Sequence, residues 1–274
     1  MTDPKTLGST GARLLAAFSQ RDPAVFTLAE SRDALRLSAQ ATSNLLSKLI
    51  RQGWIVRVRR GVYEAAPVWA TQGTFASDRF TSLALSIDPP YYVGYRSALE
   101  LYGWLQHPVI GRLYIAVPKQ RRPLRTPRDR IIWVVTKAGR FDWGVRREWI
   151  GPARVAVSDR ERTFLDCLHL PRHAGGLTEI AAALKRAWPS LDAQRLSNHT
   201  ARLGNTTVAR RLGALVDALE LEGGEDVTRA LRQQTWRGRP VSLDPSIPAG
   251  GLVDPRWGVR MNVPIEELAA VGAT

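Results

Sequence analysis

Residues 38–63, SAQATSNLLSKLIRQGWIVRVRRGVY, constrain the fold of this chain most, because they predict a helix followed at once by a basic β-hairpin. Ser38 can cap a helix by accepting a hydrogen bond from a free backbone N–H, and Gly53 tolerates the left-handed turn that ends one. At about 100° per residue, the helix between them has an apolar and a polar side. The apolar side is expected to carry Leu45, Leu46, Leu49 and Ile50.

The polar side of this helix is expected to carry Gln40, Asn44, Ser47, Lys48 and Arg51, with Ser43 on the flank. Short amide and hydroxyl side chains can reach base edges in a major groove, and the two cations can reach phosphates. The pattern therefore predicts a DNA-recognition helix. An ordinary solvated helix shows the same pattern, so that alternative stays open.

The residues after this helix favour the DNA interpretation. Alternation over 54–59 predicts a strand, and Arg59-Arg60-Gly61 predicts a turn before the return strand begins. Arg57, Arg59 and Arg60 would then neutralise phosphates beside the groove that the helix enters. The alternative is a solvated hairpin.

The charge of the chain supports an anionic partner. The 274 residues include 39 Lys and Arg against 25 Asp and Glu, a net charge of +14, which attracts nucleic acid without reading its sequence. No apolar run is long enough for a membrane span, and the first residues lack the pattern of an export signal. Cys167 is the only cysteine, which excludes an internal disulfide and fits a reducing cytoplasm.

The first 66 residues predict a winged helix-turn-helix. We expect helices at 11–20 and 30–35, a short strand at 26–28, and then the helix and hairpin described above. Residues 64–74 show little amphipathic order and predict a linker, which gives domains at 1–66 and 76–274 joined by 67–75.

The second domain is expected to be mixed α/β, so the whole chain falls in the α+β class, with a β-sheet and several helices after the winged helix. The patterns predict strands at 91–94, 113–117, 131–136 and 154–157, with short β-like pieces at 241–243 and 258–263. They predict helices at 75–87, 96–104, 159–168, 177–187, 192–203 and 206–222.

Residues 119–130, KQRRPLRTPRDR, contain six basic residues and one acidic residue in twelve. Such a segment can be a second phosphate contact, a docking surface for an acidic partner, or a solvated loop. Five of the six are the candidates for a second contact: Lys119, Arg121, Arg122, Arg125 and Arg128.

Catalytic and cofactor patterns are weak, and we expect neither an enzyme, nor a metal, nor a bound cofactor. His169 and His173 lie near Cys167, but Pro171 interrupts the helix that would align the two imidazoles. The chain contains no D-x-D motif for magnesium and no glycine-rich phosphate-binding loop. The acidic residues of the helix at 159–168, Asp159, Glu161 and Asp166, are interpreted as a capping group and a solvated face.

Four motifs resemble the AbiEi antitoxins, the transcriptional-regulator halves of abortive-infection toxin–antitoxin pairs. They are YVGYRSAL at 92–99 continuing to LYGW at 101–104, SDRERTFLD at 158–166, RLG at 211–213 continuing to LVDAL, and LIRQGW at 49–54 with RRGVY at 59–63. In the third motif, Asp217 stands where the family has Glu. The likeness covers most of the chain in the right order.

The resemblance implies a repressor that binds inverted repeats in double-stranded DNA ahead of its own operon, with two copies on one operator. It also implies a second domain that counters a co-encoded nucleotidyltransferase toxin. Two other functions remain open: a stand-alone regulator with a ligand-sensing domain, and a nucleic-acid-processing enzyme. The enzyme would need distant carboxylates, for instance Glu100, Asp142, Glu148 and Asp166, to come together.

Overall fold

The structure is a computed structural model of the chain. It describes residues 7–21, 24–65, 80, 83, 87–107, 109–124, 129–150, 153–233, 238–264 and 268.

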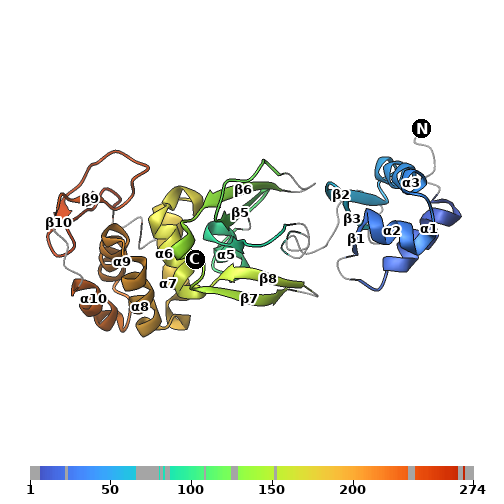
Figure 1. Cartoon of the computed structure of the whole chain (residues 1–274). Coiled ribbons are helices and arrows are strands. Elements are labelled where there is room, and N and C mark those ends of the chain that lie inside the picture. The colour runs from blue at the N-terminus through green and yellow to red at the C-terminus, as the bar shows by residue number, and fades with distance from the viewer. Residues whose placement is uncertain are drawn as a thin grey trace.

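The N-terminal unit contains three helices and a small antiparallel sheet (Figure 1). Its elements are α1 (Gly8–Phe18), β1 (Val25–Thr27), α2 (Leu28–Leu35), α3 (Ala39–Arg51), β2 (Ile55–Arg59) and β3 (Val62–Ala65). The strands lie in the order β1-β3-β2. Apolar side chains from all three helices and from the sheet form one core, among them Leu14, Phe26, Leu46, Leu49 and Ile55. The predicted order of helix, short strand, helix, helix and hairpin is confirmed.

Local hydrogen bonds set where α2 begins. The Thr27 hydroxyl accepts from the Glu30 backbone N–H at 3.1 Å, and the Glu30 carboxylate accepts from the Thr27 N–H at 2.7 Å. This reciprocal capping box starts the helix at Leu28. The predicted strand at 26–28 was therefore displaced by one residue, and the predicted helix start at Glu30 was wrong by two residues.

The predicted linker was wrong at its first two residues. Glu64 and Ala65 belong to β3, where Glu64 pairs with Val25 on one side and Val56 on the other and is buried. The rest of the predicted linker, residues 66–75, lies outside the described residues. So does most of the predicted helix at 75–87. Of its described residues, Phe80 and Leu83 are helical and buried, whereas Ile87 is buried but lies in a bend.

The larger unit is built on a mixed five-stranded sheet. Its strands are β4 (Tyr92–Val93), β5 (Arg112–Val117), β6 (Arg130–Val135), β7 (Val145–Ile150) and β8 (Ala153–Ser158), in the order β6-β5-β4-β8-β7. The pairs β5/β6 and β4/β8 are parallel and the others antiparallel. Alternate residues contribute to two separate apolar clusters, so Val93 and Ile115 lie in one and Tyr92 and Tyr114 in the other.

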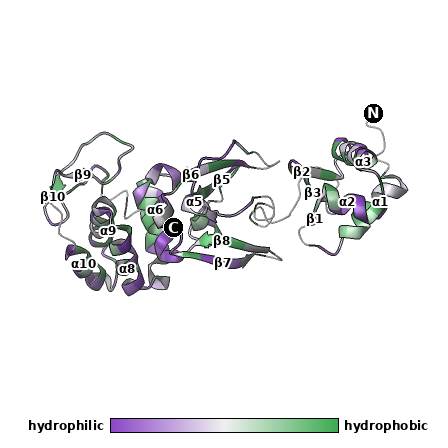
Figure 2. Cartoon of the chain, in the orientation of Figure 1, coloured by the Kyte–Doolittle hydropathy of each residue, from purple (hydrophilic) through white to green (hydrophobic). Residues whose placement is uncertain are grey.

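Helices pack beyond one end of this sheet (Figure 1). After α5 (Tyr95–Leu101), they are α6 (Arg160–His169), α7 (Leu177–Ala187), α8 (Ala193–Leu203), α9 (Thr206–Ala218) and α10 (Gly224–Arg232). Figure 2 shows mixed colouring along α8, α9 and α10, as expected for helices with one side in a core. The prediction that a single helix runs from 206 to 222 was wrong, because α9 ends at Ala218 and Glu220 adopts a positive φ of 49°.

A small C-terminal sheet packs on the helices. It contains β9 (Val241–Ser242), β10 (Val253–Asp254) and β11 (Val259–Arg260). The Trp257 ring from this segment lies so close to α9 that a Cβ on Gly213 would fall 2.3 Å from it. Arg211 donates to the backbone carbonyls of Leu168 and Ser242, which ties α6, α9 and the small sheet together.

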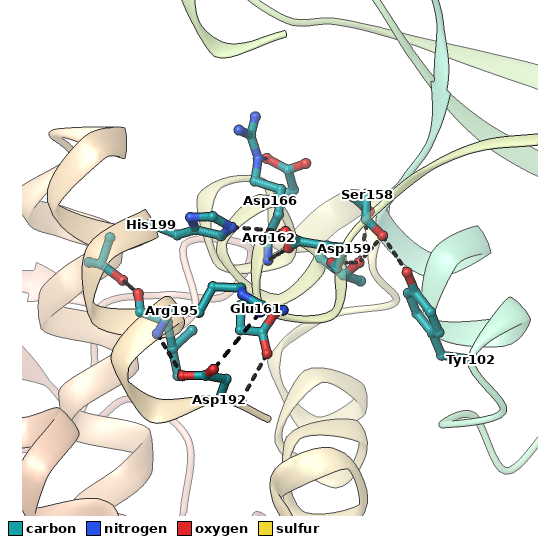
Figure 3. Close-up of polar contacts among 12 residues, drawn as sticks. Tyr102, Ser158, Asp159, Glu161, Arg162, Asp166, Asp192, Arg195 and His199 are labelled. Carbon is teal, nitrogen blue, oxygen red and sulfur yellow. Dashed lines mark hydrogen bonds and ion pairs between the residues drawn. The ribbon is translucent and has the colours of Figure 1, made fainter. Parts of the chain in front are cut away.

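Asp159, Glu161 and Asp166 are buried, so the predicted solvated face was wrong. Figure 3 shows their polar contacts. Asp159 does cap the helix as predicted, by accepting from the Arg162 N–H at 2.8 Å, and its other oxygen lies 2.9 Å from His199 Nε2. Glu161 accepts from the Asp192 backbone N–H at 2.9 Å. Asp166 pairs with Arg162 at 2.7 Å. Partners on distant elements, which helical periodicity cannot reveal, stabilise these carboxylates inside the protein.

Within the described ranges, every helix is too short or too polar to cross a lipid bilayer.

Candidate nucleic-acid interface

The outward face of α3 is polar and accessible. The Ser38 hydroxyl caps the helix by accepting from the Ala41 N–H at 3.2 Å. Leu46 and Leu49 are buried on the opposite side of the helix. Five of the predicted DNA contacts are exposed: Gln40, Asn44, Ser47, Lys48 and Arg51. The sixth, Ser43, is partly buried on the flank. The core leaves this face available to a duplex.

Two amide side chains on this face form a hydrogen bond with each other. The Gln40 Nε2 group donates to Asn44 Oδ1 at 3.0 Å, one turn along the helix. This contact still leaves the Asn44 amide hydrogens and one Gln40 hydrogen for a base edge. The pair therefore presents a partly ordered set of donors and acceptors, which lowers the entropic cost of binding.

The hairpin follows α3 after only three residues. The Trp54 N–H donates to the Leu49 carbonyl at 3.0 Å, and Gly53 adopts the left-handed φ of 73° that ends the helix. Because a chain reversal this short leaves little freedom, the direction of the hairpin is fixed relative to the exposed polar face of α3.

The hairpin tip is tied to α2. Gly61 has a φ of 79°, with nothing within 4 Å of the place where a Cβ would stand, and its carbonyl accepts from the Leu28 N–H at 3.0 Å. Arg57 and Arg60 have exposed side chains. The Arg59 backbone pairs with Val62 beyond an irregularity in the ladder, while its side chain lies outside the described atoms.

Sequence analysis missed Arg36 as a basic residue of this region. It is exposed and ends α2 in the left-handed conformation, with a φ of 53°. A non-glycine residue in this conformation is uncommon and signals a tight turn. Because Arg36 stands in the turn that enters α3, it adds positive charge beside the start of that helix.

The second basic segment is only partly available to a ligand. Lys119 and Arg122 are exposed. Arg121 instead donates to the Pro90 carbonyl at 2.9 Å and lies 5.5 Å from the Trp133 ring centroid, so its guanidinium holds the segment against the sheet. Arg125 and Arg128 lie outside the described residues.

The carboxylates considered for catalysis stand in different settings. Asp166 is buried against Arg162, and Asp142 is exposed. Glu100 and Glu148 are half-buried on α5 and β7. Over the part of the chain that the structure describes, no three His, Cys, Asp or Glu side chains gather as metal ligands.

Comparison with known proteins identifies a structure with a similar fold and a family that matches the N-terminal part of the chain. No curated protein matches the chain. The crystal structure of the Rv2827c protein from Mycobacterium tuberculosis resembles it over 99% of this chain and 98% of that one, with a TM-score of 0.72 and 15% identity. At that identity, the likeness concerns the fold alone. Residues 13–66 match the family model of the transcriptional regulator AbiEi antitoxin, so the resemblance drawn from the sequence is confirmed for the part of the chain that holds α3 and the hairpin.

Proposed function

We propose that the chain is a DNA-binding antitoxin that represses its own operon in the cytoplasm by binding inverted repeats. The observation that carries this proposal is the exposed polar face of α3, followed after three residues by an arginine-bearing hairpin. Gln40, Ser43, Asn44 and Ser47 would contact bases in the major groove. Lys48, Arg51, Arg57, Arg59 and Arg60 would contact phosphates, with Lys119 and Arg122 as a second contact.

The antitoxin part of the proposal rests on the AbiEi resemblance. The larger unit, residues 76–274 as we divide the chain, would counter a nucleotidyltransferase toxin encoded beside it, without catalysing a reaction itself. Inverted repeats would place two copies on one operator, since a two-fold DNA site is matched by two equivalent domains.

Fluorescence anisotropy with the full chain tests DNA binding. A labelled duplex from upstream of the chain's own gene should bind at least about a thousandfold more tightly than a shuffled duplex of equal length at physiological salt. Equal affinity for the two duplexes would contradict operator recognition. Co-expression with the neighbouring gene then tests the antitoxin role separately, because only an antitoxin rescues growth. Incubation with DNA or RNA and magnesium tests the absence of nuclease activity.

A further inference from the structure

A cavity of about 140 Å³ lies beside α6 in the larger unit. The end of β6 and the turn after it line one side through Thr136, Lys137 and Arg140, and α6 lines the other through Arg162 and Asp166. Tyr95 also lines the cavity, from the start of α5. Neither the winged helix nor the basic segment at 119–124 is among its walls, so the proposed DNA contacts do not account for it.

Arg162 is the most unusual residue of the cavity wall. Its side chain is 1% exposed and lies with its guanidinium carbon 3.9 Å from the Trp143 ring centroid. Its Nε donates to Asp166 at 2.7 Å, and Nη2 lies 3.4 Å from the Tyr92 hydroxyl. The third nitrogen, Nη1, is buried without a hydrogen-bond partner among the described residues. A buried guanidinium donor left unsatisfied is costly, so it marks a place for an acceptor.

Asp166 does not supply that acceptor. One of its oxygens accepts from Arg162 and the other accepts from the Tyr92 hydroxyl at 2.8 Å (Figure 3 shows Arg162 and Asp166 side by side on α6). Both oxygens are therefore occupied by internal donors. The carboxylate balances one positive charge and orients the guanidinium beside the cavity.

The remaining charge on the cavity wall is positive. Lys137, Arg140 and Arg162 contribute three positive charges against the one negative charge of Asp166, which leaves an excess of two. Burial, reinforced by the nearby Arg140, lowers the pKa of His169, so this imidazole adds no charge near neutral pH. An excess of positive charge in a mostly buried site favours an anion.

The volume limits the size of that anion. A cavity of about 150 Å³ holds a molecule the size of benzene, and a water molecule takes about 30 Å³. A tetrahedral oxyanion with five heavy atoms fits these limits, and a whole nucleotide exceeds them. The Thr136 hydroxyl adds a neutral hydrogen-bonding group beside the cations.

We propose that this cavity binds one phosphate group, held by the guanidinium of Arg162 and by the side chains of Lys137 and Arg140, all of which line it. The phosphate is either a free ion or the end of a larger molecule whose remainder stays outside. Tyr95 and Arg162 both line the cavity and belong to two of the AbiEi-like motifs, at 92–99 and 158–166. A bound phosphate would therefore give these two motifs a shared function.

Isothermal titration calorimetry and ³¹P NMR with inorganic phosphate test the proposal on the full chain without DNA, in a phosphate-free buffer of fixed ionic strength. We expect one phosphate per chain. The double variant Lys137→Ala with Arg140→Ala should raise the Kd at least about tenfold, because each removed cation contributed a charge-assisted hydrogen bond. The matched control, Lys185→Ala with Arg239→Ala, removes the same charge from exposed sites and should change the Kd less than about twofold.

Absence of phosphate binding to the wild-type chain, or an equal loss in both double variants, would overturn the proposal. Arg162→Lys, checked for folding by circular dichroism, should also weaken binding, because lysine keeps the charge and loses the guanidinium donors.

Titrations with AMP and with adenosine show whether the phosphate is a free ion or part of a larger molecule. If AMP binds more tightly than inorganic phosphate and adenosine does not bind, the phosphate belongs to a larger molecule. If AMP and inorganic phosphate bind with equal affinity, the ligand is the free ion. Operator affinity, measured beside these, should be the same in both double variants, which separates this site from DNA binding.

Discussion

The indole N–H of Trp257 donates a 2.7 Å hydrogen bond to the carboxylate of Asp217, one helical turn beyond Gly213. This contact accounts for the glycine of the R-L-G motif at 211–213 of α9, whose Arg211 donates to the carbonyls of Leu168 and Ser242. Gly213 admits the ring, Asp217 accepts its N–H, and Arg210 donates to the Trp257 carbonyl at 2.8 Å. The small C-terminal sheet is thereby held on the helices.

Gly213→Ala should therefore destabilise the protein. The new methyl group would lie 2.3 Å from the buried ring, and overpacking of this kind costs about 1–3 kcal/mol of unfolding free energy. Urea denaturation followed by circular dichroism measures the change. Gly250→Ala is the control, since a methyl group there meets no atom within 4 Å. A loss of stability no greater than that of the control would refute the close-packing argument.

Replacing Arg162 by Met should destabilise the protein more strongly. The change leaves Asp166 buried without its cation, and breaking a buried ion pair from one side costs about 3–5 kcal/mol. Tyr92→Phe, which removes only the hydroxyl donor to Asp166, should cost about 1–2 kcal/mol. Thermal and urea unfolding give both values, and the reverse ranking would show that the ion pair is not the dominant interaction.

His173 should make stability depend on pH. Burial, and then the neighbouring Arg172, lowers the pKa of His173 to about 4, below its unfolded value of about 6.5. The unfolded chain therefore binds more protons than the folded chain between pH 6.5 and 4. Stability should be complete above pH 6.5 and fall as the pH drops through this window.

His173→Gln should reduce that slope in urea titrations at successive pH values. His107→Gln is the control, because the His107 side chain is exposed. Identical slopes in wild type and His173→Gln would remove the imidazole from the explanation.

The hairpin prediction concerns salt dependence. Arg59→Ala with Arg60→Ala should weaken binding to every duplex and flatten the plot of log K against log salt by about two units, because two phosphate contacts are lost. Lys185→Ala with Arg239→Ala removes equal charge from the larger unit. If both pairs flatten the plot equally, net charge rather than the hairpin explains the effect.

The Asn44 prediction concerns sequence recognition. Asn44→Ala should cost roughly 1–3 kcal/mol at the preferred operator and leave binding to random DNA unchanged. Asn198→Ala is a matched control, because Gln194 and Asn198 form the same 3.0 Å amide contact on the exposed side of α8. Equal losses on both duplexes would assign Asn44 a role in general affinity.

Local signals in the sequence located most of the elements. Ser38 and Gly53 bracket α3 because capping and left-handed turns depend on a few neighbouring residues. Strand β7 escaped prediction because Arg146, Arg147 and Glu148 interrupt the alternation of apolar residues. Helix α10 escaped because it is short and starts beside two glycines.

Of the two candidate sites, the sequence predicts one and not the other. The exposed face of α3 follows from helical periodicity alone. The cavity does not, because Tyr95 and Arg162, which line it, lie on α5 and α6, elements far apart in the chain that tertiary packing brings together. A pattern along one helix gives Asp166 a polar position but gives no sign of its distant partners.

The hydrogen bond between the Leu28 N–H and the Gly61 carbonyl has a consequence for the proposed complex with DNA. It anchors the loop of the hairpin to α2, the helix that precedes the turn into α3. The distance between the exposed face of α3 and the arginines of the hairpin is therefore set before a duplex binds. A duplex that engages both must adjust its own groove width to that spacing, and stretches that deform easily will be preferred even where no side chain touches a base.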